Sequence, residues 1–237
     1  MVSRYLKTIC VIAATSILSA PAFSEPVLNL VTVNTKDPAG YIGWAASSSE
    51  ALSKANGAST MGICVPRGGA EVAGDLYLYS LFDSQKTAWS AEFMNKTMVA
   101  EVAKNKADRT IRFWDNYRIV RTSTGTTSAT GDKSYQWNVL VSTTNMSKYL
   151  ASLDKLQSAM QANDFADISM QAFVPDTGDR VGKVMVSMAA TSSTRLGEAL
   201  DARTEPWFAN TLKGLSNIRT YEHAWALECT TLYNAQP

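Results

Sequence analysis

The sequence contains one histidine, His223, and this is the side chain best suited to acid–base chemistry. It lies in the segment Tyr221-Glu222-His223-Ala224-Trp225. Successive side chains of a strand point to opposite faces, so Tyr221, His223 and Trp225 are predicted to share one face. An imidazole titrates near neutral pH, which makes His223 the candidate catalytic residue if the protein is an enzyme. The alternative is an amphipathic strand whose aromatic residues are core and whose histidine is hydrogen-bonded filler.

A second segment, residues 110–120, has the same alternation of aromatic and polar side chains. Aligning Trp114 with Trp225 places Arg112 opposite His223. An aromatic wall with a few polar groups is typical of a cavity that holds a small molecule, and the predicted ligand is apolar or aromatic. The predicted ligand-binding residues, which include two tyrosines of a third strand, are Tyr77, Tyr79, Arg112, Trp114, Tyr221, His223 and Trp225.

Several kinds of chemistry are excluded by what the sequence lacks. One histidine cannot supply a metal site that needs two, such as the HExxH pair or the two-histidine, one-carboxylate triad. The sequence has no CxxC pair, no P-loop, no GxGxxG loop and no GxSxG elbow. We therefore predict no metal site and no cofactor.

For the other charged residues the sequence leaves alternative roles open. Asp115 and Glu222 could form a carboxylate pair, but no spacing rule joins them, and solvated or salt-bridged roles are expected. Four arginines on one predicted strand either receive an anionic ligand or protect a sheet edge from pairing. These arginines are Arg109, Arg112, Arg118 and Arg121.

The first 24 residues have the pattern of an export signal. A positively charged start and an apolar run over residues 8–18 precede the small-residue motif Ala20-Pro21-Ala22. The run is short for a bilayer span, so cleavage after Ala22 or Ser24 and a periplasmic or secreted protein are expected, with an uncleaved anchor as the alternative. Cleavage changes the net charge from +1 to −1, because the segment carries two cations and no anion. A near-neutral protein is not expected to bind nucleic acid or a membrane surface.

The remaining chain contains one pattern twice. The stretch 33–42 is echoed 108 residues later by the stretch 141–150, and in both an alternating apolar run leads to a helix cap and a tyrosine. Pro206 is expected to interrupt the last helix. The predicted strands are 27–33, 59–65, 75–82, 110–120, 136–142, 168–174, 183–189 and 218–232. The predicted helices are 38–55, one long helix from Asp83 or Ser84 that carries Trp89, Phe93 and Val102, 146–160, and an interrupted helix after Ser192 or Ser193.

The Ser/Thr/Gly-rich segment 122–134 is predicted to be a flexible linker between repeats at 25–121 and 135–237. Each repeat has the order strand, helix, strand, strand, helix, strand, which is the ferredoxin-like order. With the paired openings and the two Val-Pro dipeptides at 65–66 and 174–175, the chain resembles the dimeric α+β barrel superfamily in a tandem fused form. In these features the chain is similar to antibiotic-biosynthesis-monooxygenase-like domains. The resemblance implies an α+β fold in which two ferredoxin-like βαββαβ repeats pack sheet to sheet as a pseudo-dimeric barrel.

In such a fold Cys64 and Cys229 lie on opposite sheet edges that meet at a seam, so the resemblance implies a disulfide between them. They are the two cysteines left after cleavage, since Cys10 lies in the signal. An export compartment permits the bond, and two separately buried thiols are the alternative.

The resemblance also implies a range of activities: cofactor-free monooxygenation, polyketide cyclisation, haem binding or breakdown, and plain small-molecule binding. Haem needs an axial ligand, usually histidine, and His223 does not match a family haem motif. We expect an exported protein that binds a small molecule between its two repeats. The alternatives are a cofactor-independent monooxygenase- or cyclase-type enzyme that uses His223, and a non-catalytic interaction module with a filled interior.

Overall fold

The computed structural model describes residues 24–122 and 128–235. Most of the predicted export signal and part of the predicted linker therefore lie outside the described residues. The elements of the first half are β1 (Val27–Thr35), α1 (Pro38–Asn56), β2 (Thr60–Gly68), β3 (Asp75–Phe82), α2 (Gln85–Ser90), α3 (Lys96–Lys104) and β4 (Arg109–Arg121). Those of the second half are β5 (Lys133–Thr143), α4 (Met146–Ala162), β6 (Ser169–Pro175), β7 (Lys183–Ala190), α5 (Ser193–Asp201), the 3₁₀ turn η1 (Ala202–Thr204), α6 (Pro206–Lys213) and β8 (Arg219–Asn234).

The first helix of each half begins at the predicted cap. The Asp37 side chain accepts a hydrogen bond from the Gly40 N–H, and the Asn145 side chain accepts one from the Lys148 N–H. Such caps satisfy backbone donors that the helix itself cannot pair. Gly57 ends α1 in the left-handed conformation, with φ at 80°.

The long second helix predicted after Ser84 is wrong. Ser84 does cap a helix, but α2 ends at Ser90, and Ala91 is extended. A new helix, α3, begins after Asn95, whose side chain accepts from the Met98 N–H. A second good cap eleven residues downstream therefore competes with continuation of the helix. The break leaves Phe93 outside both helices, edge-on to the indole of Trp114.

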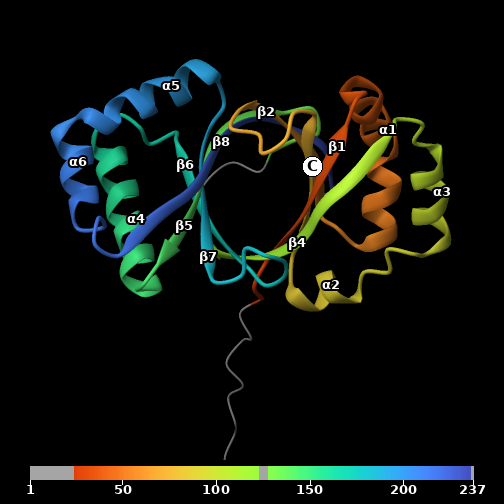
Figure 1. The fold of residues 1–237 in the computed structure, drawn as a ribbon, viewed down its shortest axis with the longest axis horizontal. Helices are drawn as coiled ribbons and strands as arrows, with labels where there is room; N and C mark the ends of the chain where they lie inside the picture. Colours follow the sequence, from red (N-terminus) through yellow and green to blue (C-terminus); the bar gives the residue numbers. More distant parts are fainter. Residues whose placement is uncertain (1–23, 123–127, 236–237) are drawn as a thin grey trace, which may run out of the picture.

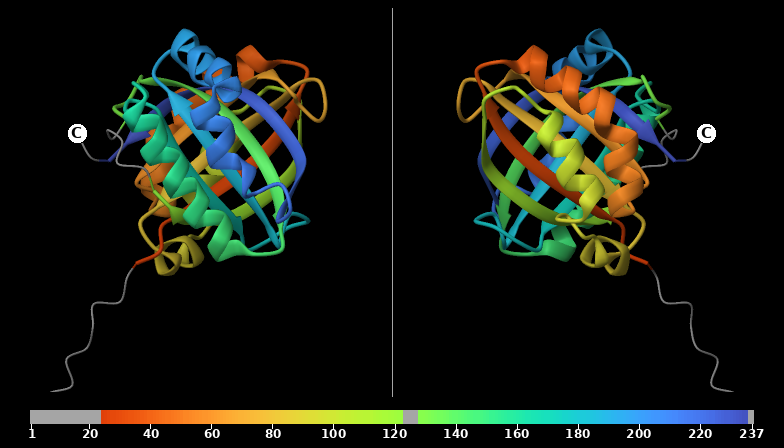
Figure 2. Two further views of the ribbon diagram at one scale, coloured as in Figure 1. Left: turned by 90° about the vertical axis from the view of Figure 1, so that its left-hand side faces the viewer. Right: turned by 90° about the vertical axis from the view of Figure 1, so that its right-hand side faces the viewer.

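The eight strands form one closed barrel in the order β1-β3-β2-β8-β5-β7-β6-β4, and all pairings are antiparallel. Figure 1 shows the barrel at the centre, with α1 and α3 on one side and α4, α5 and α6 on the other. The two side views in Figure 2 show how each helical layer covers the outer face of its strands. The fold is thus α+β, as predicted, and closure leaves the barrel without a free edge.

Two seams close the barrel, where β2 pairs with β8 and β4 pairs with β6. Cys64 and Cys229 are register partners at the first seam and form a disulfide, with a sulfur–sulfur distance of 2.04 Å. The predicted bond is confirmed. It joins two strands that lie 165 residues apart in the sequence.

The predicted linker is shorter than expected. Lys133 and Ser134 already belong to β5. The turn before them is hydrogen-bonded to β8, because the Gly131 N–H donates to the Thr231 carbonyl at 2.8 Å and the Thr231 N–H donates to the Asp132 carbonyl at 2.9 Å. This part of the connector is therefore an extension of the sheet.

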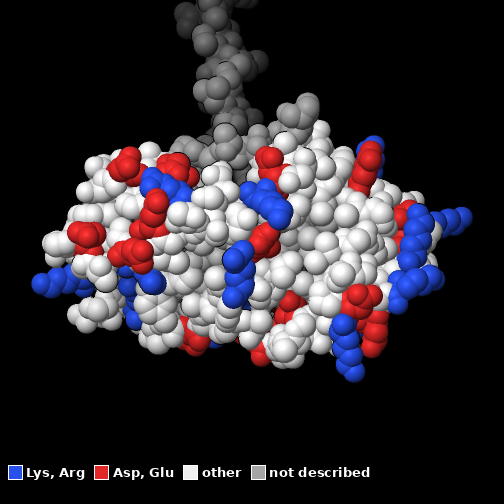
Figure 3. Space-filling model, turned by 90° about the horizontal axis from the view of Figure 1, so that it is seen from above, with Lys and Arg blue, Asp and Glu red and all other residues white. Residues whose placement is uncertain are grey.

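Within the described residues, no helix combines the length and apolar character that a membrane span requires. Figure 3 shows one face of the molecule, on which acidic and basic side chains are interspersed over a largely uncharged surface.

Candidate functional site

The inside of the barrel contains a cavity of about 430 Å³. Alternate residues of each strand point inward, and in the first half these residues are largely apolar or aromatic. The cavity reaches the surface beside Asp83 and Ser128, at the end of the barrel where β3 ends and β5 begins. Its first-half wall is formed by Leu28, Leu30, Tyr77, Tyr79 and Leu81.

The opposite wall is polar near the mouth. In the strand order of the barrel, β5 stands across from β1 and β7 across from β3. Asn138 of β5, Ser187 of β7 and Gln171 of β6 are register neighbours, and all three line the cavity together with Gln136. Deeper in the barrel the same strands contribute Phe173 and Met185. The cavity therefore has an apolar wall, an amide-rich wall and an apolar floor.

Asn138 and Ser187 are the buried polar residues of this wall. The Asn138 side chain is in the cavity lining, and the residue is 4% exposed. No described residue donates a hydrogen bond to the Asn138 Oδ1 atom. The neighbouring Ser187 hydroxyl donates instead to Gln136 Oε1, at 3.3 Å. A buried acceptor without a donor costs about 1–3 kcal/mol, so it is uncommon in folded proteins.

The tyrosines of the apolar wall are neutral hydrogen-bonding groups. Burial raises the pKa of Tyr77 to about 12, and burial also raises the pKa of Tyr79. Tyr77 is roughly stacked on Trp225, with ring centroids 6.4 Å apart. At neutral pH these phenols can donate a hydrogen bond, but they cannot serve as bases.

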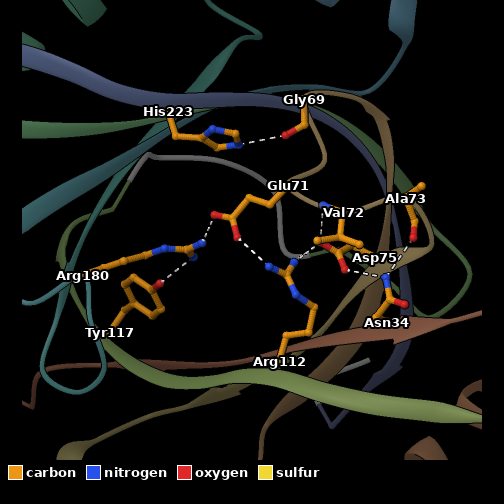
Figure 4. A network of polar contacts seen from close by, with 10 residues as sticks. All are labelled: Asn34, Gly69, Glu71, Val72, Ala73, Asp75, Arg112, Tyr117, Arg180 and His223. Carbon is orange, nitrogen blue, oxygen red and sulfur yellow. Dashed lines mark hydrogen bonds and ion pairs between the residues drawn. The ribbon is translucent and has the colours of Figure 1, made fainter.

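The other end of the barrel is closed by charged side chains (Figure 4). Glu71, in the loop between β2 and β3, pairs with Arg180 at 2.5 Å and with Arg112 at 3.3 Å. Arg112 also pairs with the fully buried carboxylate of Asp75. The Arg180 guanidinium lies over the Phe113 ring at 5.1 Å, and its side chain is 11% exposed. This ionic plug, defined as Glu71, Asp75, Arg112 and Arg180, leaves the cavity with its mouth at the opposite end.

Asp115 is buried beside the plug, so of the solvated or salt-bridged roles expected for it the solvated one is wrong. It is 4% exposed and lies against Gly178, where a Cβ atom would come within 1.9 Å of its Oδ1. Gly178 has φ at 79°, so both its conformation and its lack of a side chain suit the position. Burial raises the pKa of the Asp115 carboxyl, and the nearby Arg180 partly opposes this shift. Glu222 has the salt-bridged role expected for it, since its carboxylate pairs with Lys183 and accepts a hydrogen bond from the Ser142 hydroxyl.

A pH-dependent effect on stability is expected from the Asp115→Asn variant. A carboxyl whose pKa is raised by folding stabilises the protein in its protonated form, and this contribution is lost as the pH rises through the folded pKa. The amide side chain of the variant cannot ionise. As the pH rises from 4 to 7, the melting temperature of the variant should therefore rise by a few degrees relative to that of the wild type.

The matched control for this experiment is Asp167→Asn. Hydrogen bonding to Arg195 lowers the pKa of the Asp167 carboxyl, so this variant should fall behind the wild type as the pH rises to about 4 and should keep a nearly constant difference between pH 4 and pH 7. Thermal unfolding at several pH values measures both differences. An Asp115→Asn difference that is constant with pH would contradict the assignment.

Two β-bulges change where the predicted site residues lie. The β1–β4 register steps from Thr32↔Phe113 to Val33↔Ile111, so Arg112 is an extra residue. The β5–β8 register steps from Leu140↔His223 to Val141↔Tyr221, so Glu222 is an extra residue there. A bulge reverses the inward and outward alternation beyond it.

The predicted alignment of Trp114 with Trp225 is therefore wrong by one residue, since the register makes Phe113 the counterpart of His223. Trp114 lies on the outer face, is 46% exposed, and donates from its indole nitrogen to Asn29 Oδ1 at 3.1 Å. Tyr221 also lies outside, at 51% exposure, under the guanidinium of Arg219. The expectation that Tyr221, His223 and Trp225 share one face is wrong for Tyr221.

The other predicted residues are divided between the cavity and the closed end. Tyr77, Tyr79 and Trp225 line the barrel cavity together. Arg112 belongs to the ionic plug. His223 Nε2 lies 2.8 Å from the Gly69 carbonyl oxygen, and the imidazole packs on Trp225, with ring centroids 5.0 Å apart. His223 is thus held at the closed end and is absent from the barrel cavity's lining.

The arginines of β4 are engaged within the fold. Arg118 pairs with Asp176 at 2.7 Å, and Arg121 pairs with Asp154 at 2.8 Å. Arg109 lies over the Trp44 ring. They do not guard an edge, because β4 pairs with β6.

A second cavity, of about 370 Å³, lies between the outer face of β5 and β8 and the helices α4 and α6. It is largely apolar, and Arg203 and Arg219 are among its lining residues. Burial raises the pKa of Tyr149, which also lines it, to about 12. Its other lining residues include Trp137, Leu153 and Phe208, together with the predicted site residues Tyr221 and His223.

Haem, which the sequence resemblance associates with some relatives, needs an axial ligand. Tyr149 stays protonated at neutral pH, and the His223 ring is hydrogen-bonded to the Gly69 loop. The described part of the chain contains no group of three or more His, Cys, Asp or Glu side chains that could hold a metal ion. As they are placed, the Tyr149 and His223 side chains do not fit an axially ligated haem.

Sequence reasoning missed the polar residues of the cavity, namely Asn138, Ser187, Gln171 and Gln136. One signal was present, because Asn138 interrupts the apolar run of β5 at an inward position. It also missed Arg180 and Glu71, which lie in loops that only the closed barrel brings together.

No protein-family model matches the sequence, and no curated protein matches it either. Several solved structures match the fold of the chain. A protein of Fusobacterium nucleatum named "Putative monooxygenase" has a TM-score of 0.56 and 10% identity over 90% of this chain and 94% of its own. An anthrone oxidase-like protein has a TM-score of 0.52 and 11% identity over 92% of this chain and 95% of its own.

A mutant chlorite dismutase from Candidatus Nitrospira defluvii has a TM-score of 0.53 and 10% identity over 88% of this chain and 93% of its own. At such low identity the likeness concerns architecture and leaves activity open. The chain therefore has the α+β barrel fold that these solved proteins share.

Proposed function

We propose that the protein binds a small, largely apolar or aromatic molecule inside its barrel. The observation that carries this proposal is the cavity of about 430 Å³, open at one end and walled by Tyr77, Tyr79 and Trp225. Its volume lies within the range of ligand pockets, and its mixture of aromatic and a few polar groups is typical of them. A barrel filled with side chains would have favoured the interaction module instead.

The ligand enters from the end that carries Asp83 and Ser128. At the other end the ionic plug spans the barrel, and the β2–β3 loop is tied to β8 by the hydrogen bond between Gly69 and His223. Entry from that end would require breaking several ion pairs, two of which involve largely buried side chains.

A Gln171→Trp substitution tests the proposal by filling the cavity. Gln171 points inward near the mouth, so an indole there would occupy space that the ligand needs. The neutral dye N-phenyl-1-naphthylamine should bind the wild type with enhanced fluorescence, and its affinity for the variant should fall at least tenfold. Fluorescence titration gives both dissociation constants.

The matched control is Gln161→Trp, the same exchange at an exposed position of α4. This variant should bind the dye as the wild type does. Equal affinity of Gln171→Trp and the wild type would locate the dye elsewhere, for instance in the helix-side cavity, and would refute the barrel site. Absence of binding to the wild type would refute the proposal directly.

The alternative is a cofactor-independent enzyme of the monooxygenase or cyclase type, with His223 as its acid or base. It is supported by the names of the structural neighbours, which include a monooxygenase and an oxidase-like protein. Native mass spectrometry of protein purified from its own host separates the two. A retained ligand that survives incubation in air unchanged favours binding, and its conversion to an oxidised product favours the enzyme.

Two further features belong to the same proposal. Export is supported by the disulfide, because such bonds persist in oxidising compartments. Duplication of a ferredoxin-like repeat, with repeats at 25–121 and 135–237, is supported by the matching strand orders β4-β1-β3-β2 and β8-β5-β7-β6. The equivalent bulges at Arg112 and Glu222 support it as well.

A further inference from the structure

The chemistry of the cavity wall restricts the ligand further than its size does. Among the described lining residues Asp83 is the only charged one, and it lies at the mouth. A charged ligand buried beyond this point would lose its hydration without a partner of opposite charge, which is costly. The ligand that fits is therefore neutral.

The position of Asn138 indicates one specific polar group. Asn138 lines the cavity, and its Oδ1 is buried from water and accepts from no described residue. The hydroxyl of its register partner, Ser187, donates to Gln136 instead. A hydroxyl or N–H group of a ligand would supply the missing donor once the side-chain amide turns toward the cavity that Asn138 lines.

The two walls together define the shape of the ligand. Because β1 and β3 stand opposite β5 and β7, a flat ring system in the cavity would have Leu28, Leu30 and Tyr79 on one side and the amides on the other. Apolar contact on the first side contributes affinity, and the polar side selects orientation.

We propose that Asn138 is the specificity-determining residue of the barrel site, and that its Oδ1 accepts a hydrogen bond from a hydroxyl or N–H group of a neutral aromatic ligand. This inference rests on the proposed barrel site and assigns it a ligand class: uncharged, ring-containing compounds with a donor on one edge, such as phenols.

Two probes of the same ring system test this inference. 2-Naphthol carries a hydroxyl donor, whereas 2-methoxynaphthalene keeps the oxygen as an acceptor and loses the donor. The wild type should bind 2-naphthol at least tenfold more tightly, because the ether leaves Oδ1 unpaired. 2-Naphthoate should bind at least tenfold more weakly than 2-naphthol. Isothermal titration calorimetry at pH 7 measures all three affinities.

The Asn138→Leu variant removes the acceptor while it keeps the branching and the number of heavy atoms of the side chain. It should bind 2-naphthol and 2-methoxynaphthalene with equal affinity, and the exposed Asn210→Leu variant should keep the wild-type preference. A preference that survives in Asn138→Leu would overturn the assignment.

The wild-type measurements decide the matter even if Asn138→Leu does not fold. Equal binding of naphthol and its ether would mean that water satisfies Asn138, and it would overturn the inference while leaving the barrel site intact. Tight binding of 2-naphthoate would overturn the neutral ligand class. Binding of none of the three probes would instead count against the proposed function itself.

Discussion

Replacing both Cys64 and Cys229 with serine is expected to lower the free energy of unfolding by about 3–5 kcal/mol. The bond closes a loop that spans 165 residues of sequence. The chain-entropy relation gives about 5 kcal/mol for a loop of this length, and measured effects are commonly smaller. The bond also holds the β2–β8 seam, where the first and last parts of the barrel meet.

Urea unfolding of the oxidised wild type and of the double variant measures this difference. The variant should have a lower midpoint, and its slope should be steeper, since an unfolded chain without the cross-link exposes more surface. The reduced wild type should match the double variant, which serves as the control. An unchanged midpoint, or an intact mass that shows two free thiols in the exported protein, would contradict the prediction.

Arg180→Met should produce the second large loss of stability, about 2–4 kcal/mol. The variant keeps most of the aliphatic packing but removes the cation that pairs with Glu71. It also removes the contacts of the guanidinium with the Phe113 and Trp225 rings. The buried Asp115 would then lose its nearby positive charge, which costs more than losing an exposed ion pair.

Arg67→Met provides the control, because the Arg67–Glu228 pair lies at the surface with the arginine side chain 53% exposed. Its loss should be below about 1 kcal/mol. Combining Arg180→Met with Asp115→Asn should recover part of the loss, since the two groups interact. Chemical denaturation of the four proteins measures these differences. A loss in Arg180→Met no larger than in Arg67→Met would show that the plug does not stabilise the barrel.

The two predictions concern different parts of the barrel. The disulfide fixes a seam of the barrel wall, and the ionic plug closes one end of its interior. Both are made from residues that are remote in the sequence, and each leaves the cavity mouth untouched. A cavity with one closed end and one open end is the consequence.

Local interactions made several features predictable. Asp37 and Asn145 open helices because their side chains pair with backbone groups three residues away. Tyr77 and Tyr79 face the barrel while Leu76 and Leu78 face the helices, as strict alternation requires. In a continuous strand without a bulge, successive side chains must point to opposite faces. The face on which each residue lies therefore follows from the order of the residues.

The predicted alignment of the site residues is wrong where a β-bulge interrupts the alternation of a strand. Arg112 and Glu222 are extra residues in their strands, and each moves an aromatic side chain, Trp114 or Tyr221, to the outer face. A bulge depends on how two strands pair, and the partner strand lies more than 75 residues away in both cases. Nothing in the local sequence specifies that pairing.

The sequence by itself determined the element types, the helix caps, the alternating faces of unbroken strands and the pair of cysteines available for a bond, because each depends on neighbouring residues. Only the tertiary structure decided that the strands close into one barrel, that Arg180 and Glu71 plug one end, and that Asn138 faces a cavity without a donor. These features arise from strand pairing and burial between distant segments, whose energies belong to the folded chain as a whole.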